Sequence, residues 1–366
     1  MSIAIAALGC LLIIAAAAAD RSWFDRHFLP SFWTPHEEIV RNGMRVRAAV
    51  ALGGLFLILA SRKIGRALAR DRSYALTIPL AMLLALGATE LRLRHQRIAP
   101  TEPRTHADAL VGWLNDPSRI GRVSHLERHT AYVFDRNGYR VATPQAQTDF
   151  DAPTIIFTGE SMMVGHQLAW ADTIPARTEA LLGVRSANLA VSGFATDQSY
   201  LRLVTELPRF RHPVAVVALF APAIFDRNLD DDRPHLAAGL VWRPAVTHWR
   251  ITELAVHATG YRSEAAIENG VAATRDVLAA TVRLARSRGA VPLIVVPQFE
   301  PEEPAERDLR RRILDEAHLP YIFVPLDPDD RVEADGHPDE DGAREIAEAI
   351  ADALRDSLEA PANGHE

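Results

Sequence analysis

The sequence has a single cysteine, Cys10, and a single lysine, Lys63, among its 366 residues. One cysteine cannot form an intramolecular disulfide, and it cannot build a zinc site from cysteine ligands. No run of like charge stands out and the net charge is −7, which argues against bulk nucleic-acid binding. With 48% hydrophobic and 24% charged residues, the composition excludes wholesale disorder and collagen-like repeats.

Three stretches of the first hundred residues contain no charged side chain: 2–19, 48–61 and 73–89. A membrane-spanning helix needs about 20 apolar residues, with a range of about 17–25. The first and third stretches meet this length. The second is short, but Arg47 and Arg62 could extend to the two interfaces; a buried helix of a soluble domain is the alternative. Residues 1–97 therefore predict a membrane region with two or three transmembrane helices.

The surroundings of these stretches bear on how they lie in a membrane. Five aromatic residues between the first and second stretches resemble an interfacial belt: Trp23, Phe24, Phe28, Phe32 and Trp33. No Lys or Arg precedes the first apolar core, so we interpret it as a membrane helix and not as a cleaved signal peptide. Arginines gather on both sides of the second stretch, so the positive-inside rule does not set the orientation.

Residues 98–150 form a compositionally distinct segment, rich in Pro, Thr, Asp and Arg. Alternating apolar residues flank Asn137 and Gly138, and both of these residues tolerate positive φ, so a tight β-hairpin is expected there. The segment is therefore predicted to be a linker with a β-hairpin.

Strand-like and helix-like segments alternate from residue 151 onward. Apolar runs predict strands at 154–158, 186–190, 213–220, 291–296 and 321–324. Helical periodicity predicts helices at 170–183, 196–206, 264–288, 302–317 and 340–357, while 229–262 is an irregular insertion. Such alternation is typical of a parallel sheet with helices on both faces. The predicted fold is therefore α/β: a three-layer α/β/α sandwich with a five-stranded parallel sheet over 151–358, preceded by transmembrane helices and followed by a disordered tail at 359–366.

Ligands of such sheets bind beyond the carboxyl ends of the strands, so the loops after the strands hold the candidate site. Ser161 follows the first strand at the start of a helical segment, and is either a nucleophile or a plain N-cap. Gly193 follows the second strand, and either brings its N–H close to a substrate or makes an ordinary turn. His337 follows the fifth strand, with Asp335 two residues earlier, and either accepts the serine proton or is an exposed turn histidine. His166 follows Gly165 and either lines the pocket or is an exposed helical histidine; we expect the second.

Three sequence blocks resemble the SGNH (GDSL-like) hydrolase superfamily over about residues 150–357; they are Phe-Thr-Gly-Glu-Ser at 157–161, the segment 188–198 and Asp-Gly-His-Pro-Asp-Glu-Asp-Gly at 335–342. Glu160 stands where the family usually has Asp. The resemblance implies a flavodoxin-like SGNH fold with Ser161 as nucleophile, His337 as base, Asp335 as its orienting acid, and the N–H groups of Ser161 and Gly193 as oxyanion donors. It implies no metal and no organic cofactor.

The chain departs from the family pattern at two positions. Ala223 stands where the third block usually has an asparagine whose amide completes the oxyanion hole. Losing one such donor typically costs ~10²–10³ in rate, and Asn228 is the candidate substitute. The family's acid usually lies three residues before the histidine, which is Ala334 here, whereas Asp335 lies two before.

These residues predict a membrane-anchored serine esterase or acyl hydrolase that forms an acyl-Ser161 intermediate on an acylated glycan or lipid. If a sugar hydroxyl attacks instead of water, the protein is an O-acyltransferase of envelope polysaccharide. A catalytically impaired domain that binds acylated glycans or scaffolds an envelope complex is a further alternative, which Ala223 favours. The expected partners are an acylated small-molecule, glycan or lipid substrate and the membrane, without nucleic acid. The expected location is the bacterial inner membrane, with the catalytic domain in the periplasm.

Overall fold

The computed structural model describes residues 2–31, 34–70, 73–96, 102–125, 128–333 and 335–359. Two members of the aromatic belt, Phe32 and Trp33, lie outside these ranges, as do Ala334 and residues 360–366 of the expected tail. The chain divides into two compact units: 1–99 with 247–267, and 100–246 with 268–366. Part of the 229–262 insertion thus clusters with the apolar N-terminal helices. Each unit is described separately.

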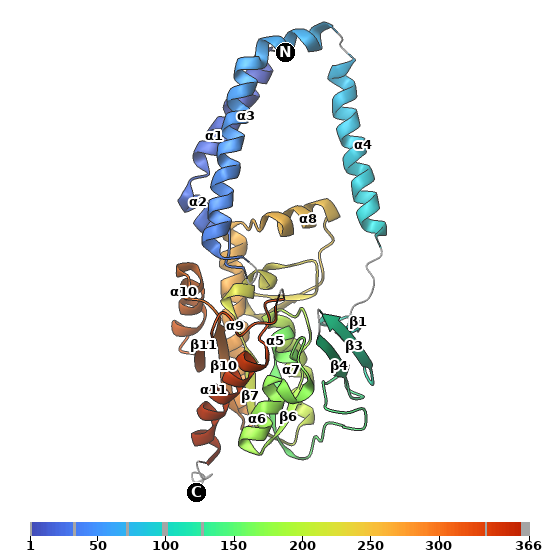
Figure 1. Cartoon of the computed structure of the whole chain (residues 1–366), viewed down its shortest axis with the longest axis vertical. Coiled ribbons are helices and arrows are strands. Elements are labelled where there is room, and N and C mark those ends of the chain that lie inside the picture. The colour runs from blue at the N-terminus through green and yellow to red at the C-terminus, as the bar shows by residue number, and fades with distance from the viewer. Residues whose placement is uncertain are drawn as a thin grey trace. The chain divides into compact units, whose positions relative to one another are not determined.

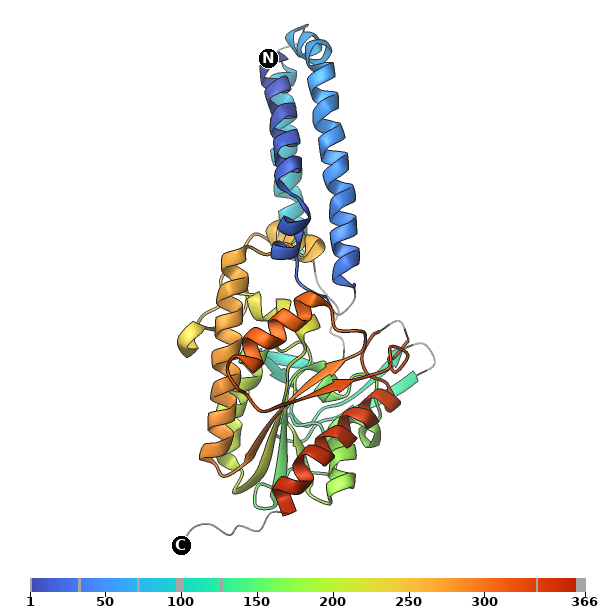
Figure 2. The same cartoon turned by 90° about the vertical axis from the view of Figure 1, so that its left-hand side faces the viewer.

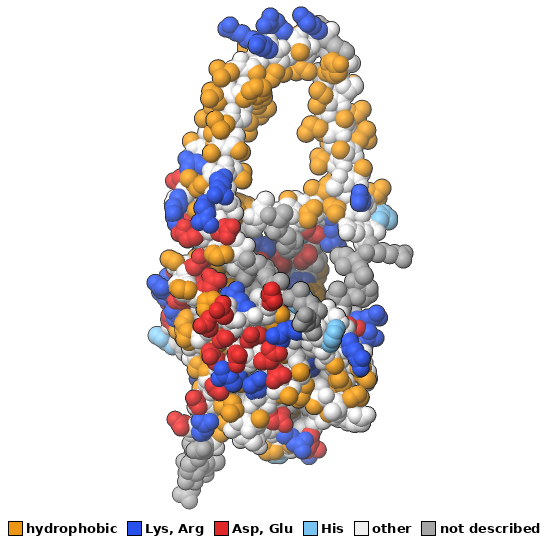
Figure 3. Space-filling view, in the orientation of Figure 1, with side chains coloured by type: hydrophobic (Ala, Val, Ile, Leu, Met, Phe, Trp, Pro, Cys, Tyr) orange, Lys and Arg blue, Asp and Glu red, His pale blue; other side chains and the backbone are white. Residues whose placement is uncertain are grey.

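The first unit is helical, with α1 (Ser2–Ala18), α2 (Arg21–His27), α3 (His36–Arg70), α4 (Tyr74–His95) and α8 (Arg250–Thr259). Helices α3 and α4 are long and apolar enough to cross a membrane, and α1 with α2 would be a third span if this pair, bent by 75°, counts as one. Hydrophobic side chains line α3 and α4 in Figure 3, and only 6% of the most apolar window of each is buried. The alternative of a buried soluble helix for 48–61 is therefore wrong.

Close contacts between small residues join the helices of this unit. An added Cβ at Gly9 would lie 2.5 Å from the Gly54 carbonyl oxygen, and one at Gly54 would lie 2.6 Å from that of Gly9. Glycine at both positions therefore allows the backbones of α1 and α3 to touch, as small residues do between membrane helices. Helix α4 meets α8 through Glu90, whose carboxylate accepts from the backbone N–H groups of Arg250 (3.1 Å) and Ile251 (3.0 Å). This carboxylate caps the positive end of α8.

The second unit contains a five-stranded parallel sheet with the order β11–β10–β7–β5–β6 (Figures 1 and 2). The strands are β5 (Pro153–Thr158), β6 (Arg185–Asn188), β7 (His212–Leu219), β10 (Val291–Gln298) and β11 (Tyr321–Pro325). The three inner strands β5, β7 and β10 are apolar runs buried along most of their length, as a parallel sheet covered by helices requires, whereas the edge strands β6 and β11 are partly exposed. The predicted α/β/α sandwich is confirmed.

Helices cover both faces of this sheet. They are α6 (Ile174–Leu182), α7 (Thr196–Glu206), α9 (Glu264–Ser287), α10 (Pro304–Arg310) and α11 (Glu340–Glu359). Leu203 of α7 and Ala285 of α9 share one core cluster with Ile156 and Val216 of the sheet. Helix α6 packs against α11. The predicted helix at 302–317 is shorter, because α10 gives way to a π turn at Arg311–Asp315, and Glu359 of the expected tail belongs to α11.

Short antiparallel pairs precede and interrupt the sandwich. They are β1 (Thr105–Asp108) with β2 (Gly112–Asn115), β3 (Ile120–His125) with β4 (Arg128–Val133), and β8 (His235–Ala237) with β9 (Val241–Arg243). At the Asn137–Gly138 turn, the N–H of Asp135 donates to the carbonyl of Tyr139 at 2.9 Å. The chain then passes from Arg140 toward β5, which brings this segment against the candidate site.

Candidate active site

Ser161 lies at the edge of the sheet where β5 ends. Gly159 and Glu160 separate it from the strand, and it begins the short helix α5 (Ser161–Val164). The Glu160 side chain caps this helix by accepting from the N–H of Met162 at 3.1 Å, and its other carboxylate oxygen accepts from Ser161 Oγ. Only 6% of Ser161 is exposed, so its hydroxyl is held in a largely dry environment.

His337 reaches this serine from the loop after β11. Its Nε2 lies 2.7 Å from Ser161 Oγ, and its Nδ1 contacts the carboxylate of Asp335. The two-residue spacing succeeds because Gly336 adopts a φ of 85°, which folds the chain back. The N–H groups of Asp335 and Gly336 both donate to the carbonyl of Val332 at 3.1 Å. Ser161, His337 and Asp335 therefore form one chain of polar contacts. When the single hydroxyl proton of Ser161 turns from Glu160 to Nε2 of His337, this is the arrangement that activates a serine hydroxyl.

A second histidine contacts the same carboxylate. His166 Nε2 lies 3.5 Å from Asp335 Oδ2, and its ring centroid lies 4.6 Å from that of His337. Burial would raise the pKa of Asp335, but hydrogen bonds from His166 and His337 outweigh it and hold this pKa well below its usual value. The expectation of an exposed helical histidine is wrong, because Gly165 adopts a φ of 81° and ends α5 before residue 166.

Arg140 holds the turn that follows Ser161, a role that the sequence analysis did not predict. Its guanidinium group donates to the carbonyls of Val164, Gly165 and Leu168, each at 2.6 Å. Arg140 is only 2% exposed, and this burial lowers the pKa of its guanidinium group to about 10. The cation therefore remains charged at neutral pH and holds the end of the turn that carries Ser161.

Gly193 lies beside the serine loop. The N–H of Val191 donates to the carbonyl of Gly159 at 3.2 Å, which ties the loop after β6 to the loop after β5. Gly193 has a φ of 80°, and Trp113 lies against it, with its indole N–H donating to the carbonyl of Ser192 at 3.1 Å. Within the described ranges, no acceptor takes the backbone N–H of Gly193 or of Ser161. Both N–H groups can therefore donate to a ligand.

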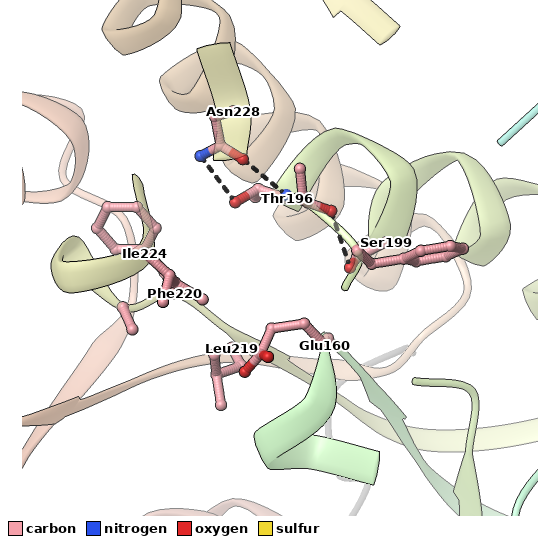
Figure 4. A pocket seen from close by; sticks show the side chains of 11 residues that line it. Glu160, Thr196, Ser199, Leu219, Phe220, Ile224 and Asn228 are labelled. Atoms are coloured by element: carbon pink, nitrogen blue, oxygen red, sulfur yellow. Dashed lines mark hydrogen bonds between the residues drawn. The ribbon is translucent and has the colours of Figure 1, made fainter. Parts of the chain in front are cut away.

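Asn228 is held differently from the expectation. It belongs to the 3₁₀ helix η3 (Pro222–Leu229) that follows β7, as does Ala223. Its amide nitrogen donates to Oγ1 of Thr196 and of Thr274, both at 3.1 Å, and its amide oxygen accepts from the N–H of Thr196 at 2.9 Å. Figure 4 shows the contacts with Thr196. Both amide protons are thus engaged within the protein, which does not favour Asn228 as an oxyanion donor.

A small pocket opens next to Glu160 (Figure 4). Its cavity volume is about 10 Å³, room for about one water molecule. Its walls come from the loops after β5, β6 and β7, and include Phe194, Leu219, Phe220 and Ile224. Arg227 of η3 contributes a cation at its edge, with Nη1 3.4 Å from Oε2 of Glu160. The serine centre therefore lies next to a small cavity whose lining is both polar and apolar.

Two groups of described residues bring three metal-ligand atoms within 4.8 Å of one another. One is His166, Asp335 and His337; the other is Asp330, Asp339 and Asp341. A divalent cation on the first group would occupy the nitrogens that the serine and the carboxylate use.

Comparison with known proteins gives similarities of structure. No family model and no curated protein matches the chain. An acetyl xylan esterase, Est2A from Butyrivibrio proteoclasticus, is similar at 11% identity and a TM-score of 0.36, over 58% of this chain and 66% of that one. Est24, a carbohydrate acetylesterase from Sinorhizobium meliloti, is similar at 12% identity and a TM-score of 0.33, over 56% and 99%. A lipolytic protein of the G-D-S-L family from Veillonella parvula is similar at 11% identity and a TM-score of 0.34, over 56% and 99%.

Proposed function

We propose that the chain is a membrane-anchored serine hydrolase of the SGNH type, an esterase that forms an acyl-Ser161 intermediate. The observation that carries the proposal is the chain of contacts from Ser161 Oγ to His337 Nε2 at 2.7 Å and on to Asp335. Such a chain lets the imidazole accept the serine proton while the carboxylate stabilises the imidazolium that forms.

The reaction takes two steps. Ser161 Oγ attacks the ester carbonyl carbon, its proton passes to His337 Nε2, and the carbonyl electron pair moves to the oxygen. The N–H groups of Ser161 and Gly193 donate to this oxyanion. When the intermediate collapses, the carbon–oxygen bond of the ester breaks and the alcohol leaves with the proton from His337. Water then attacks the acyl-serine with His337 as base, and releases the acid.

The apolar helices and the pocket suggest the class of substrate. The cavity next to Glu160, with a volume of only about 10 Å³, supports a short acyl group. Two helices able to cross a membrane support action on an acylated glycan or lipid of the cell envelope, with the chain in the bacterial inner membrane and the site in the periplasm. If a sugar hydroxyl replaces water in the second step, the same intermediate makes the protein an O-acyltransferase.

A fluorophosphonate probe tests the proposal on the full chain in detergent micelles. We expect covalent labelling that disappears in Ser161→Ala and falls strongly in His337→Ala. Ser287→Ala is the control: this exposed serine of α9 donates to the carbonyl of Leu284 at 2.7 Å, away from the site, and its variant should be labelled like the wild type. A folded wild type that takes no label would contradict the esterase and favour an impaired binding domain, for which Ala223 is the specific reason.

A second measurement separates the two acyl acceptors. Unlabelled wild-type enzyme is incubated with p-nitrophenyl acetate, with and without a neutral oligosaccharide, and the products are identified. Free acetate as the product in both cases supports the esterase. An acetylated oligosaccharide, identified by mass spectrometry and absent with Ser161→Ala, supports the transferase.

A further inference from the structure

The site lacks one of the donors that an acyl-transferring serine centre needs. Ala223 carries only a methyl group where an amide would stand in the family pattern. Asn228, the nearby amide, already donates both of its protons to Thr196 and Thr274. Two backbone N–H groups therefore remain for an oxyanion that usually receives a third donor.

A cation stands close to this gap. Arg227 lies four residues after Ala223 in the same 3₁₀ helix, and its side chain is 29% exposed. Its Nη1 is 3.4 Å from Oε2 of Glu160, the same oxygen that accepts from Ser161 Oγ. Because a hydrogen bond spans about 3 Å, the guanidinium group lies within about 6–7 Å of the serine oxygen.

We propose that Arg227 is the third oxyanion donor of this site, where its guanidinium group replaces the missing amide. The inference rests on the serine mechanism proposed above. Glu160 is the one side-chain partner of Arg227 within the described ranges, so most of its five N–H donors remain available. The guanidinium group is always protonated and presents these donors in a fixed plane, so it donates to the oxyanion without losing a proton.

Glu160 fits this role as a positioning residue. Its carboxylate is buried and lies next to the reacting oxygen, where a negative charge alone would oppose the developing oxyanion. Pairing with Arg227 offsets that charge and holds the guanidinium group at the serine. The side chain of Glu is one methylene longer than that of the family's usual Asp, and it reaches Ser161 Oγ, the N–H of Met162 and Arg227 together.

The test compares variants of the full chain in detergent, with p-nitrophenyl acetate as a neutral substrate. Arg227→Met should lower kcat by about 10²–10³ with KM changed only a few-fold, because the donor acts in the transition state. Adding Ala223→Asn to this variant should raise its kcat at least tenfold, since the asparagine supplies an amide at the position where the family usually has one. Arg243→Met, at an exposed arginine of the same unit, should leave kcat unchanged.

A merely structural role would not give this pattern. If folded Arg227→Met keeps the wild-type kcat, or if its loss appears in KM alone, the inference is wrong. Failure of Ala223→Asn to recover any activity in a folded double variant would also overturn it. Should Arg227→Met not fold, Arg227→Ala carries the same expectation, because it also offers no side-chain donor. The wild type is measured first: an inactive, unlabelled wild type overturns the serine mechanism and this inference together, whereas an active wild type with an unaffected Arg227→Met overturns only this one.

Discussion

Replacing Arg140 by methionine tests whether a buried cation holds the serine turn in place. The guanidinium group donates to the carbonyls of Val164, Gly165 and Leu168 at 2.6 Å and to that of Ala131 at 3.3 Å. Methionine fills a similar length of apolar space but offers no donor. The variant therefore leaves buried carbonyls without partners directly behind Ser161.

The magnitude follows from these contacts. A hydrogen bond to a charged group contributes about 1.5–3 kcal/mol, and a buried acceptor without a partner costs about 1–3 kcal/mol. Burial of the cation, which lowers the pKa of Arg140 to about 10, offsets part of this gain. Breaking a buried charged contact typically costs about 3–5 kcal/mol. In a unit of 150–250 residues, where 1 kcal/mol shifts Tm by about 2–4 °C, the loss corresponds to about 10 °C.

Residual labelling by the fluorophosphonate probe after heating gives the melting midpoint of the site in the full chain. Arg344→Met is the matched control, because this arginine lies on the surface of α11, where it forms a solvent-exposed ion pair with Glu348 at 3.3 Å. Its midpoint should match that of the wild type. If Arg140→Met shifts the midpoint no more than Arg344→Met does, the carbonyl contacts do not stabilise the turn and the reasoning fails.

Two further substitutions test other contacts. Asp335→Asn should lower kcat by about 10⁴, because the imidazole loses the acceptor that fixes its tautomer. Burial raises the pKa of Asp335, but hydrogen bonds from His166 and His337 lower it by more, so its pKa in the folded protein is below its usual value. This carboxylate therefore stabilises the fold above about pH 4, and the contribution is lost as the pH falls. The Tm difference between Asp335→Asn and the wild type should be largest at neutral pH and shrink in acid, and a constant difference would contradict the assignment. Glu90→Ala should speed hydrogen exchange at the start of α8, where Arg250 and Ile251 lose their capping carboxylate, while exchange in α11 stays unchanged. Equal exchange at the start of α8 in the variant and the wild type would show that the cap has no effect.

The sandwich could be predicted because its inner strands β5, β7 and β10 are buried on both faces and therefore form long apolar runs in the sequence. The same pattern locates the loops at the carboxyl ends of β5, β6 and β11, and the structure brings Ser161, Asp335 and His337 together there. Helix α7 begins and ends where the periodicity places it, at Thr196 and Glu206. Local signals suffice for elements of this kind.

Residues that act through tertiary contacts gave no such signal. Arg140 lies in a polar stretch after an Asn-Gly turn, and only the folded chain places it among the carbonyls behind Ser161. His166 was expected in the helical segment that begins at Ser161, five positions earlier, but the left-handed Gly165 turns it back toward Asp335. One backbone angle thus decides whether this histidine faces solvent or the site.

The loop of Asp335 shows the same dependence on one backbone angle. An acid two residues before the histidine is one residue closer than the family pattern, and sequence spacing alone cannot tell whether its carboxylate reaches the imidazole. Gly336 can adopt a φ of 85°, which a residue with a side chain rarely takes, and this turn brings the carboxylate onto Nδ1 of His337. His166 then contacts the free oxygen of the same carboxylate, at 3.5 Å. The shorter spacing and the second histidine therefore belong to one arrangement, in which two glycines, at 165 and 336, set the geometry of the acid.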